Sequence, residues 1–103
     1  SIRSNFIGAQ KILRVIKRGE SDIIILMGKN PIIGNGIGVS IYLMRDEFEI
    51  LIGQGVVFTI QHDGKIQIKL LNIEPSSEED WKSITDNSPD MLMRTVVKPG
   101  SQV

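Results

Sequence analysis

Two glutamates stand one residue apart within the segment RDEFEILIGQGVVFTIQHDGK, residues 45–65. They are Glu47 and Glu49, and Asp46 precedes them. In a β-strand, residues i and i+2 share a face, so these carboxylates are expected to point the same way, roughly 6.5–7 Å apart along the strand. Such a pair can act on two groups of one substrate. The same pattern also suits a solvated strand face, because a half-buried strand needs polar residues on its outer side.

The wider segment resembles the E-x-E segment of the ADP-ribosyltransferase toxins and ectoenzymes. The family pattern, E-x-E followed by hydrophobic residues, a glycine and a phenylalanine, is matched by residues 47–49, Gly55 and Phe58. Upstream, KILRVIKRG at 11–19 is similar to the strand that precedes this segment in the family. The resemblance covers about residues 11–70 and corresponds to the C-terminal half of such a domain.

The resemblance implies a role for each acid. Glu49 would be the catalytic glutamate: it would accept a hydrogen bond from a ribose hydroxyl of NAD and stabilise the positive sugar as nicotinamide leaves. Glu47 would orient or deprotonate the acceptor, which is an arginine of a target protein in this branch of the family. The region just before the acids, with Tyr42, would match the loop that this family uses to recognise its acceptor, and we expect Tyr42 and Phe48 to contact the substrate.

The implied function is therefore NAD-dependent mono-ADP-ribosyl transfer to a protein, with NAD as a substrate and no metal. A secreted bacterial toxin or effector is the setting that the resemblance implies. The family also binds NAD through an arginine on an early strand and a Ser-Thr-Ser strand, and this sequence has no Ser-Thr-Ser. The residues that would hold NAD thus stay unassigned.

The start of the chain bears on its domain organisation. The chain begins at Ser1 without methionine, and the family's serine strand would fall at or just before this residue. We expect residues 1–103 to be either a single domain or the C-terminal fragment of a transferase-like domain, with 98–103 as a tail. A fragment would need the missing N-terminal part of its own domain as a partner.

Composition excludes several classes of function. Twelve basic and twelve acidic residues cancel, which argues against a nucleic-acid binder that neutralises phosphates. Cysteine is absent, so a disulfide scaffold and a thiol nucleophile are excluded, and one histidine, His62, cannot form a His-rich metal site. No apolar run approaches the ~20 residues of a membrane span.

Hydrophobic periodicity and turn residues predict a mainly β domain, of the β or α+β class. We expect a small antiparallel sheet or sandwich of five to seven short strands with one or two short helices. Glycine turns are expected at 53–55 and at Asp63-Gly64, and a helical turn before residue 10. A helix is expected over about 77–85, where Ser76 and Glu79 have capping-box spacing. The predicted strands are 11–17, 22–27, 37–44, 47–52, 56–61, 65–73 and 91–97.

Alternation also predicts the core. Residues of one parity on three consecutive strands are apolar, and we expect Trp81 to pack on them from the helix. The predicted core residues are Phe48, Ile50, Ile52, Val56, Phe58, Ile60, Ile66, Ile68 and Leu70.

Two functions without catalysis remain open. One is a small β domain for protein interaction, as an oligomeric or structural piece of a larger assembly. The other is an RNA-binding β module, since residues 49–70 are loosely similar to the strands of the carbon-storage-regulator family. The characteristic arginines and Ala-Pro segment of that family are not matched. A 5% aromatic content also argues against a platform on which bases stack.

Overall fold

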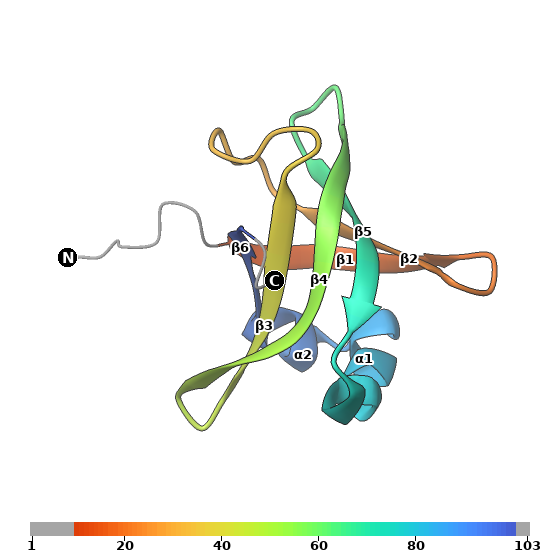
Figure 1. Ribbon diagram of the computed structural model, residues 1–103, viewed down its shortest axis with the longest axis vertical. Coiled ribbons are helices and arrows are strands. Elements are labelled where there is room, and N and C mark those ends of the chain that lie inside the picture. Colours follow the sequence, from red (N-terminus) through yellow and green to blue (C-terminus); the bar gives the residue numbers. More distant parts are fainter. Residues whose placement is uncertain (1–9, 101–103) are drawn as a thin grey trace.

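The computed structural model describes residues 10–100, which form a closed barrel of antiparallel strands with two short α-helices beside it (Figure 1). Around the barrel the order is β1-β2-β5-β4-β3-β6, and β6 returns to pair with β1. This confirms the predicted mainly β class. The elements are β1 (Gln10–Arg18), β2 (Asp22–Met27), β3 (Gly38–Arg45), β4 (Phe48–Ile60), β5 (Ile66–Ile73), η2 (Pro75–Ser77), α1 (Glu78–Thr85), α2 (Pro89–Arg94) and β6 (Thr95–Pro99).

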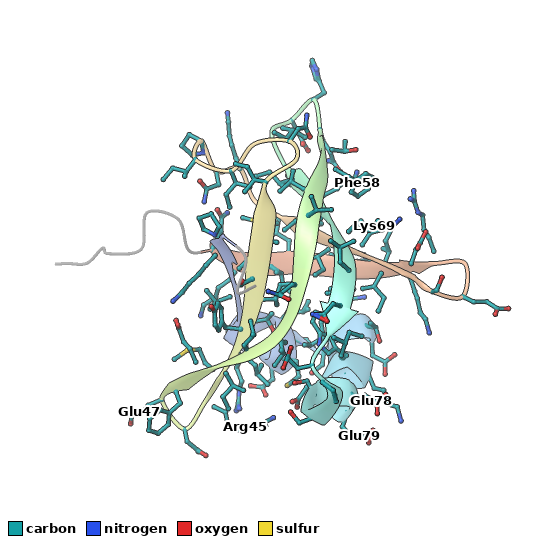
Figure 2. All side chains as sticks on the ribbon, viewed as in Figure 1. Arg45, Glu47, Phe58, Lys69, Glu78 and Glu79 are labelled. Atoms are coloured by element: carbon teal, nitrogen blue, oxygen red, sulfur yellow. The ribbon has the colours of Figure 1, made fainter. Side chains whose placement is uncertain are left out.

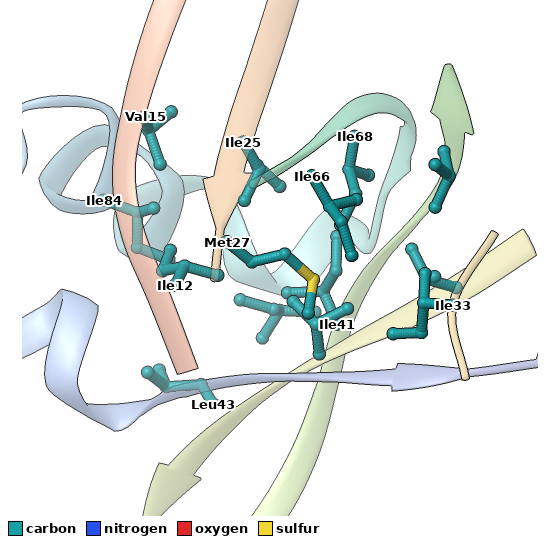
Figure 3. Packing of buried hydrophobic residues seen from close by; sticks show 14 of the residues in the cluster. Ile12, Val15, Ile25, Met27, Ile33, Ile41, Leu43, Ile66, Ile68 and Ile84 are labelled. Atoms are coloured by element: carbon teal, nitrogen blue, oxygen red, sulfur yellow. The ribbon is translucent and has the colours of Figure 1, made fainter. Parts of the chain in front are cut away.

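The barrel interior is filled mainly by β-branched side chains (Figure 3). Valine and isoleucine suit the pleated surface of a strand, and each one fully buried stabilises the fold by roughly 1.5–3 kcal/mol. Buried Ile66 and Ile68 alternate with more exposed residues along the first part of β5, as expected for a strand with one buried face, whereas the adjacent Ile24 and Ile25 of β2 are both buried. The buried cluster comprises Ile12, Val15, Ile25, Met27, Ile33, Val39, Ile41, Leu43, Ile52, Val57, Ile66, Ile68, Trp81, Ile84 and Val97.

The glycine turn predicted at 53–55 is wrong, because β4 is one continuous strand of 13 residues. Gly53 and Gly55 lie where the β5 backbone comes close. A Cβ at Gly53 would stand 2.8 Å from the carbonyl oxygen of Asn72, and one at Gly55 would stand 2.7 Å from that of Lys69. Glycine is required here for close approach of two strands rather than for a change of chain direction.

The predicted core is right in part. Ile52, Ile66 and Ile68 are buried, whereas Phe48 is 72% exposed and Phe58 is 38% exposed. The strand pairing of β4 and β5 shifts register between Gln54 and Gly55 and again between Val57 and Thr59. The first shift leaves Leu71 of β5 as an extra residue, and the second leaves Phe58 of β4 as one, so Phe58 lies outside the core. Phe48 precedes both shifts and lies beside the hairpin turn, outside the part of β4 that pairs with β5.

Three other residues of the predicted core also differ from expectation. Ile50 and Ile60 are 38% and 41% exposed, and Val57 is buried in place of Val56. Leu70 is partly buried and packs against the core as predicted. Strict period-two alternation therefore fails along β4 and holds along the first part of β5.

The C-terminal third begins as predicted and then differs. Helix α1 matches the predicted helix, and Trp81 is buried with its Nε1 donating to the carbonyl oxygen of Ile52 at 2.8 Å. The N-cap of α1 is Ser77, and no side chain caps it, so the capping box is wrong.

The last predicted strand begins too early. Residues 91–94 belong to α2, which begins at Pro89 after Ser88. A proline in the first turn after a serine is a helix start signal, and it outweighs the apolar character of MLM. Lys98 and Pro99 are part of β6 rather than of a tail. The helical turn expected before residue 10 lies outside the described residues.

Candidate functional site

The four predicted site residues, Tyr42, Glu47, Phe48 and Glu49, all lie on the hairpin formed by β3 and β4. Figure 2 shows Glu47 at the end of this hairpin. Arg45 pairs with Phe48, so Asp46 and Glu47 are the two central residues of the turn. Their φ angles are +51° and +72°, the positive values of a type I′ hairpin turn. Glu47 is thus a turn residue, and the expectation that it shares a strand face with Glu49 is wrong.

Glu49 lies on the outer side of the barrel and is paired with a lysine of β6. Lys98 Nζ stands 2.5 Å from Glu49 Oε1 and 5.1 Å from the centroid of the Tyr42 ring. The side chains of Lys98 and Glu49 are 34% and 31% exposed. The structure therefore brings Glu49 and Tyr42 together around one ammonium group, whose charge offsets that of the carboxylate.

Phe48 and Glu47 lie apart from that cluster, at the tip of the hairpin. The tip extends beyond the barrel at the lower left of Figure 1. Arg45 connects the hairpin to α1 through an ion pair with Asp80, in which Nη2 and Oδ1 are 2.6 Å apart. The hairpin thus presents an exposed phenyl ring and two turn carboxylates to solvent.

A second surface, which sequence reasoning missed, covers the outer side of β1, β2 and β5 and reaches β4. In this surface Ile16 pairs with Ile24, and Ile24 pairs with Lys69. Ile24 points away from the inner core cluster and is nevertheless only 3% exposed. We call this surface the basic wall; it comprises Arg14, Ile16, Arg18, Ile24, Leu26, Phe58 and Lys69.

The basic wall contains a small depression of about 90 Å³ with an apolar floor. Ile24 and Leu26 line it, with Ile16 and Arg14 beside them. Two glutamines complete the lining, Gln61 and Gln67, and the Nε2 of Gln67 donates to the Oε1 of Gln61 at 2.7 Å. The depression can therefore accept an apolar group next to a guanidinium.

The cations of the basic wall are largely without acidic neighbours. The side chains of Arg14 and Lys69 are exposed and form no ion pair or hydrogen bond with another residue in the described range 10–100. The guanidinium of Arg18 lies 5.9 Å from the centroid of the Phe58 ring. Asp22, opposite Arg18 at the end of β2, is the acid that borders the wall.

The acids gather elsewhere in the molecule. Nine of the twelve lie on the β3–β4 hairpin, on α1 and α2, or directly beside these helices. A chain with no net charge thus has a basic wall and an acidic end. The nine are Asp46, Glu47, Glu49, Glu74, Glu78, Glu79, Asp80, Asp86 and Asp90.

A second depression, of about 290 Å³, opens at the end of the barrel beside the Asp63-Gly64 turn. Ile33, Ile60 and Ile66 line it, and Lys29 is the charged residue of its lining. The Oδ1 of Asn30 there accepts a hydrogen bond from the backbone nitrogen of Ile32 at 2.9 Å, so this oxygen already has a partner in its own loop. The depression is apolar and offers one cation.

One sequence signal could have revealed the basic wall. Arg14, Ile16 and Arg18 recur with period two along β1, which places all three on the outer face. An outward isoleucine between two arginines differs from an ordinary solvated face. Leu13 does not fit this alternation: it is apolar and yet 50% exposed, because the pairing of β1 with β2 shifts register between Ile12 and Arg14.

No protein-family model, no curated protein and no solved structure matches this chain. Within residues 10–100, no group of three or more histidine, aspartate or glutamate side chains is placed to hold a metal ion. Neither helix of this part of the chain is long and apolar enough to cross a membrane.

Proposed function

We propose that this barrel is a non-enzymatic protein-interaction domain whose basic wall binds an acidic segment with apolar side chains. One observation carries the proposal: on the outside of a closed barrel, unpaired Arg14 lines an apolar depression, and unpaired Lys69 is the strand partner of Ile24 in its floor. Contiguous exposed apolar surface with a polar border is typical of interaction sites.

Apolar burial and charge pairing would both contribute to such binding. Ile16 is 46% exposed and Phe58 is 38% exposed, so a partner that covers them removes apolar surface from water, which is worth roughly 25 cal/mol per Å² before the cost of association. Arg14 presents a planar guanidinium that suits a carboxylate. Carboxylates beside an aliphatic or aromatic side chain therefore match the wall in both respects.

The barrel makes the wall rigid before binding. Strands β2 and β5 are paired on both sides, and β1 is held along β2 from Ile12 to Arg18. A partner therefore does not have to order the surface that it binds. Preorganisation of this kind improves affinity because it lowers the entropy lost on association.

A peptide titration tests the proposal. The probe is a synthetic peptide rich in aspartate and glutamate with a central Leu-Phe pair, and its control carries lysine in place of each acid. We expect the acidic peptide to bind, the basic one not to bind, and Arg14→Glu to weaken binding at least about tenfold. Lys29→Glu is the control, since Lys29 lies at the barrel end. Equal binding of both peptides, or no effect of Arg14→Glu, would contradict the proposal.

NAD-dependent ADP-ribosyl transfer is the second candidate, and the cluster around Lys98 favours it. Tyr42 and Glu49 lie on one outer face there, so a substrate could contact both. Under this proposal Glu49→Gln abolishes transfer to an arginine-containing acceptor protein and sharply reduces NAD cleavage. Glu47→Gln loses transfer but retains slow NAD hydrolysis. Absence of NAD binding by calorimetry, together with absence of transfer to the acceptor protein, would remove the candidate.

A further inference from the structure

We infer that the segment bound by the basic wall is the β3–β4 hairpin of a second copy of this chain, so that copies associate head to tail. This inference rests on the proposed function and names its partner. The hairpin carries the chemistry that the wall requires. Its turn bears Asp46 and Glu47, and the adjacent Phe48 is 72% exposed, the largest exposed fraction among the large hydrophobic side chains of the described residues.

The hairpin also supplies apolar surface behind its tip. Ile50 is 38% exposed although it pairs with Leu43, which is buried in the barrel. A second copy that covers Phe48 and Ile50 removes both side chains from water. The phenyl ring of Phe48 therefore suits the apolar depression of the basic wall, and the carboxylates of Asp46 and Glu47 suit the guanidinium of Arg14 beside it.

Within one copy the hairpin and the basic wall lie on different parts of the barrel. Figure 2 shows Glu47 at the lower left and Phe58 and Lys69 at the upper right. The ion pair of Arg45 with Asp80 also connects the end of the hairpin next to its turn to α1. The contact must therefore form between copies rather than within one.

The distribution of charge favours the same orientation. The acidic end includes the hairpin and the two helices, while the wall carries Arg14, Arg18 and Lys69. When the acidic end of one copy meets the wall of the next, unlike charges approach and like charges separate. Such a contact uses two different surfaces, so it builds a ring or an open chain of copies rather than a closed two-fold dimer.

The turn conformation is a further, independent reason to assign a role to its charges. Type I′ turns favour Asn-Gly or Asp-Gly because both central residues have positive φ. Here Glu47 occupies the second central position at φ +72°, where glycine would be free of steric strain. A charged side chain thus stands at a position where it disfavours the fold, which is expected if the carboxylate contacts a partner.

Two single variants and their mixture test the inference. Phe48→Ser removes the anchor of the hairpin and leaves the wall intact, whereas Arg14→Glu reverses a wall charge and leaves the hairpin intact. Both side chains are exposed, so both variants should fold. Sedimentation equilibrium should show the parent mass rising with concentration from about 1 µM to about 1 mM, and each variant should remain monomeric.

An equimolar mixture of the two variants should form a 1:1 complex, because the hairpin of Arg14→Glu still finds the intact wall of Phe48→Ser. Lys29→Glu should associate like the parent. A parent that stays monomeric at every concentration, a variant that associates like the parent, or a mixture that stays monomeric overturns the inference. If the acidic peptide nevertheless binds the wall, the proposed function survives with another protein as partner; if the peptide also fails, both proposals fail.

Discussion

The side-chain amide of Asn87 takes the place of a strand partner for Val15 on the edge of β1 that faces away from β2. The backbone nitrogen of Val15 donates to the Oδ1 of Asn87 at 2.7 Å, and the Nδ2 of Asn87 donates to the carbonyl oxygen of Val15 at 2.8 Å. Strands β1 and β6 pair only near Gln10 and Lys11, so Val15 lies beyond the point where β6 leaves β1. One residue between α1 and α2 therefore continues the barrel closure beside Arg14.

Removal of this amide should destabilise the fold. Asn87→Gly is the variant of choice, because Asn87 has φ +59° and alanine would add backbone strain there. It leaves a partly buried N–H and a partly buried C=O of Val15 unpaired, and we expect the free energy of unfolding to fall by about 2 kcal/mol. Urea denaturation measures the change. Asn72→Ala is the control, because the amide of Asn72 makes a solvent-exposed hydrogen bond to the side chain of Gln54, and the variant should change the free energy of unfolding by about 0.5 kcal/mol or less. Equal losses in both variants would show that Asn87 does not support the closure.

A methyl group at Gly55 should also destabilise the barrel. The new Cβ would stand 2.7 Å from the carbonyl oxygen of Lys69 and 2.8 Å from the Cγ2 of Ile68, so β4 and β5 must move apart. We expect Gly55→Ala to lower the free energy of unfolding by about 1–3 kcal/mol. Gly34→Ala is the control, since its Cβ meets its nearest atom at 4.0 Å. Thermal unfolding of both variants decides the point, and an unchanged melting temperature for Gly55→Ala would contradict the close approach.

Glu47→Gly should raise the stability of the fold and weaken its self-association. Glycine adopts positive φ without steric strain, so the free energy of unfolding should rise by about 0.5–1 kcal/mol. The same change removes a carboxylate from the hairpin tip and should weaken self-association. Urea denaturation and sedimentation of one preparation provide both values. Loss of stability with unchanged association would contradict the role assigned to Glu47.

Asp63 should contribute to stability in a pH-dependent way. Hydrogen bonds from the backbone and then the side chain of Lys65 hold the pKa of Asp63 below its ordinary value of 3.8. A carboxyl whose pKa is lower in the folded state stabilises the fold above the unfolded pKa, and this stabilisation is lost as the pH falls through the folded pKa. Asp63→Asn should therefore be less stable than the parent at about pH 6, and the difference should shrink at about pH 2. A difference that stays constant over this range would show that ionisation of Asp63 plays no part.

Local sequence patterns predict most of the strands because those strands follow simple periodicity. Residues 22–27 form a strand with the predicted bounds, β1 and β3 differ from prediction by one residue at each end, and β5 differs by one residue at its start. The continuity of β4 was not predictable locally, since Gly53 and Gly55 read as a turn until β5 and Trp81 are seen to pack against them. The exposure of Phe58 likewise depends on a register shift that only the paired strand reveals.

The candidate site was harder to predict than the fold. The spacing of Glu47 and Glu49 predicts two carboxylates on one strand face. Glu47 instead lies in a turn, and this depends on the pairing of Arg45 with Phe48, which the sequence does not reveal. The basic wall joins residues from β1, β2, β5 and β4, which are far apart in sequence. Equal numbers of acidic and basic residues conceal the separation of charge, because only the fold places the acids at one end.

The most direct test of the central claim is to map where the acidic peptide contacts the labelled chain by nuclear magnetic resonance. The account predicts that amide shifts on titration concentrate at Arg14, Ile16, Leu26 and Lys69, and that they diminish as salt is added. Shifts confined to the depression at the barrel end, or absent from β1, β2 and β5 altogether, would contradict the claim that the basic wall is the binding surface of this domain.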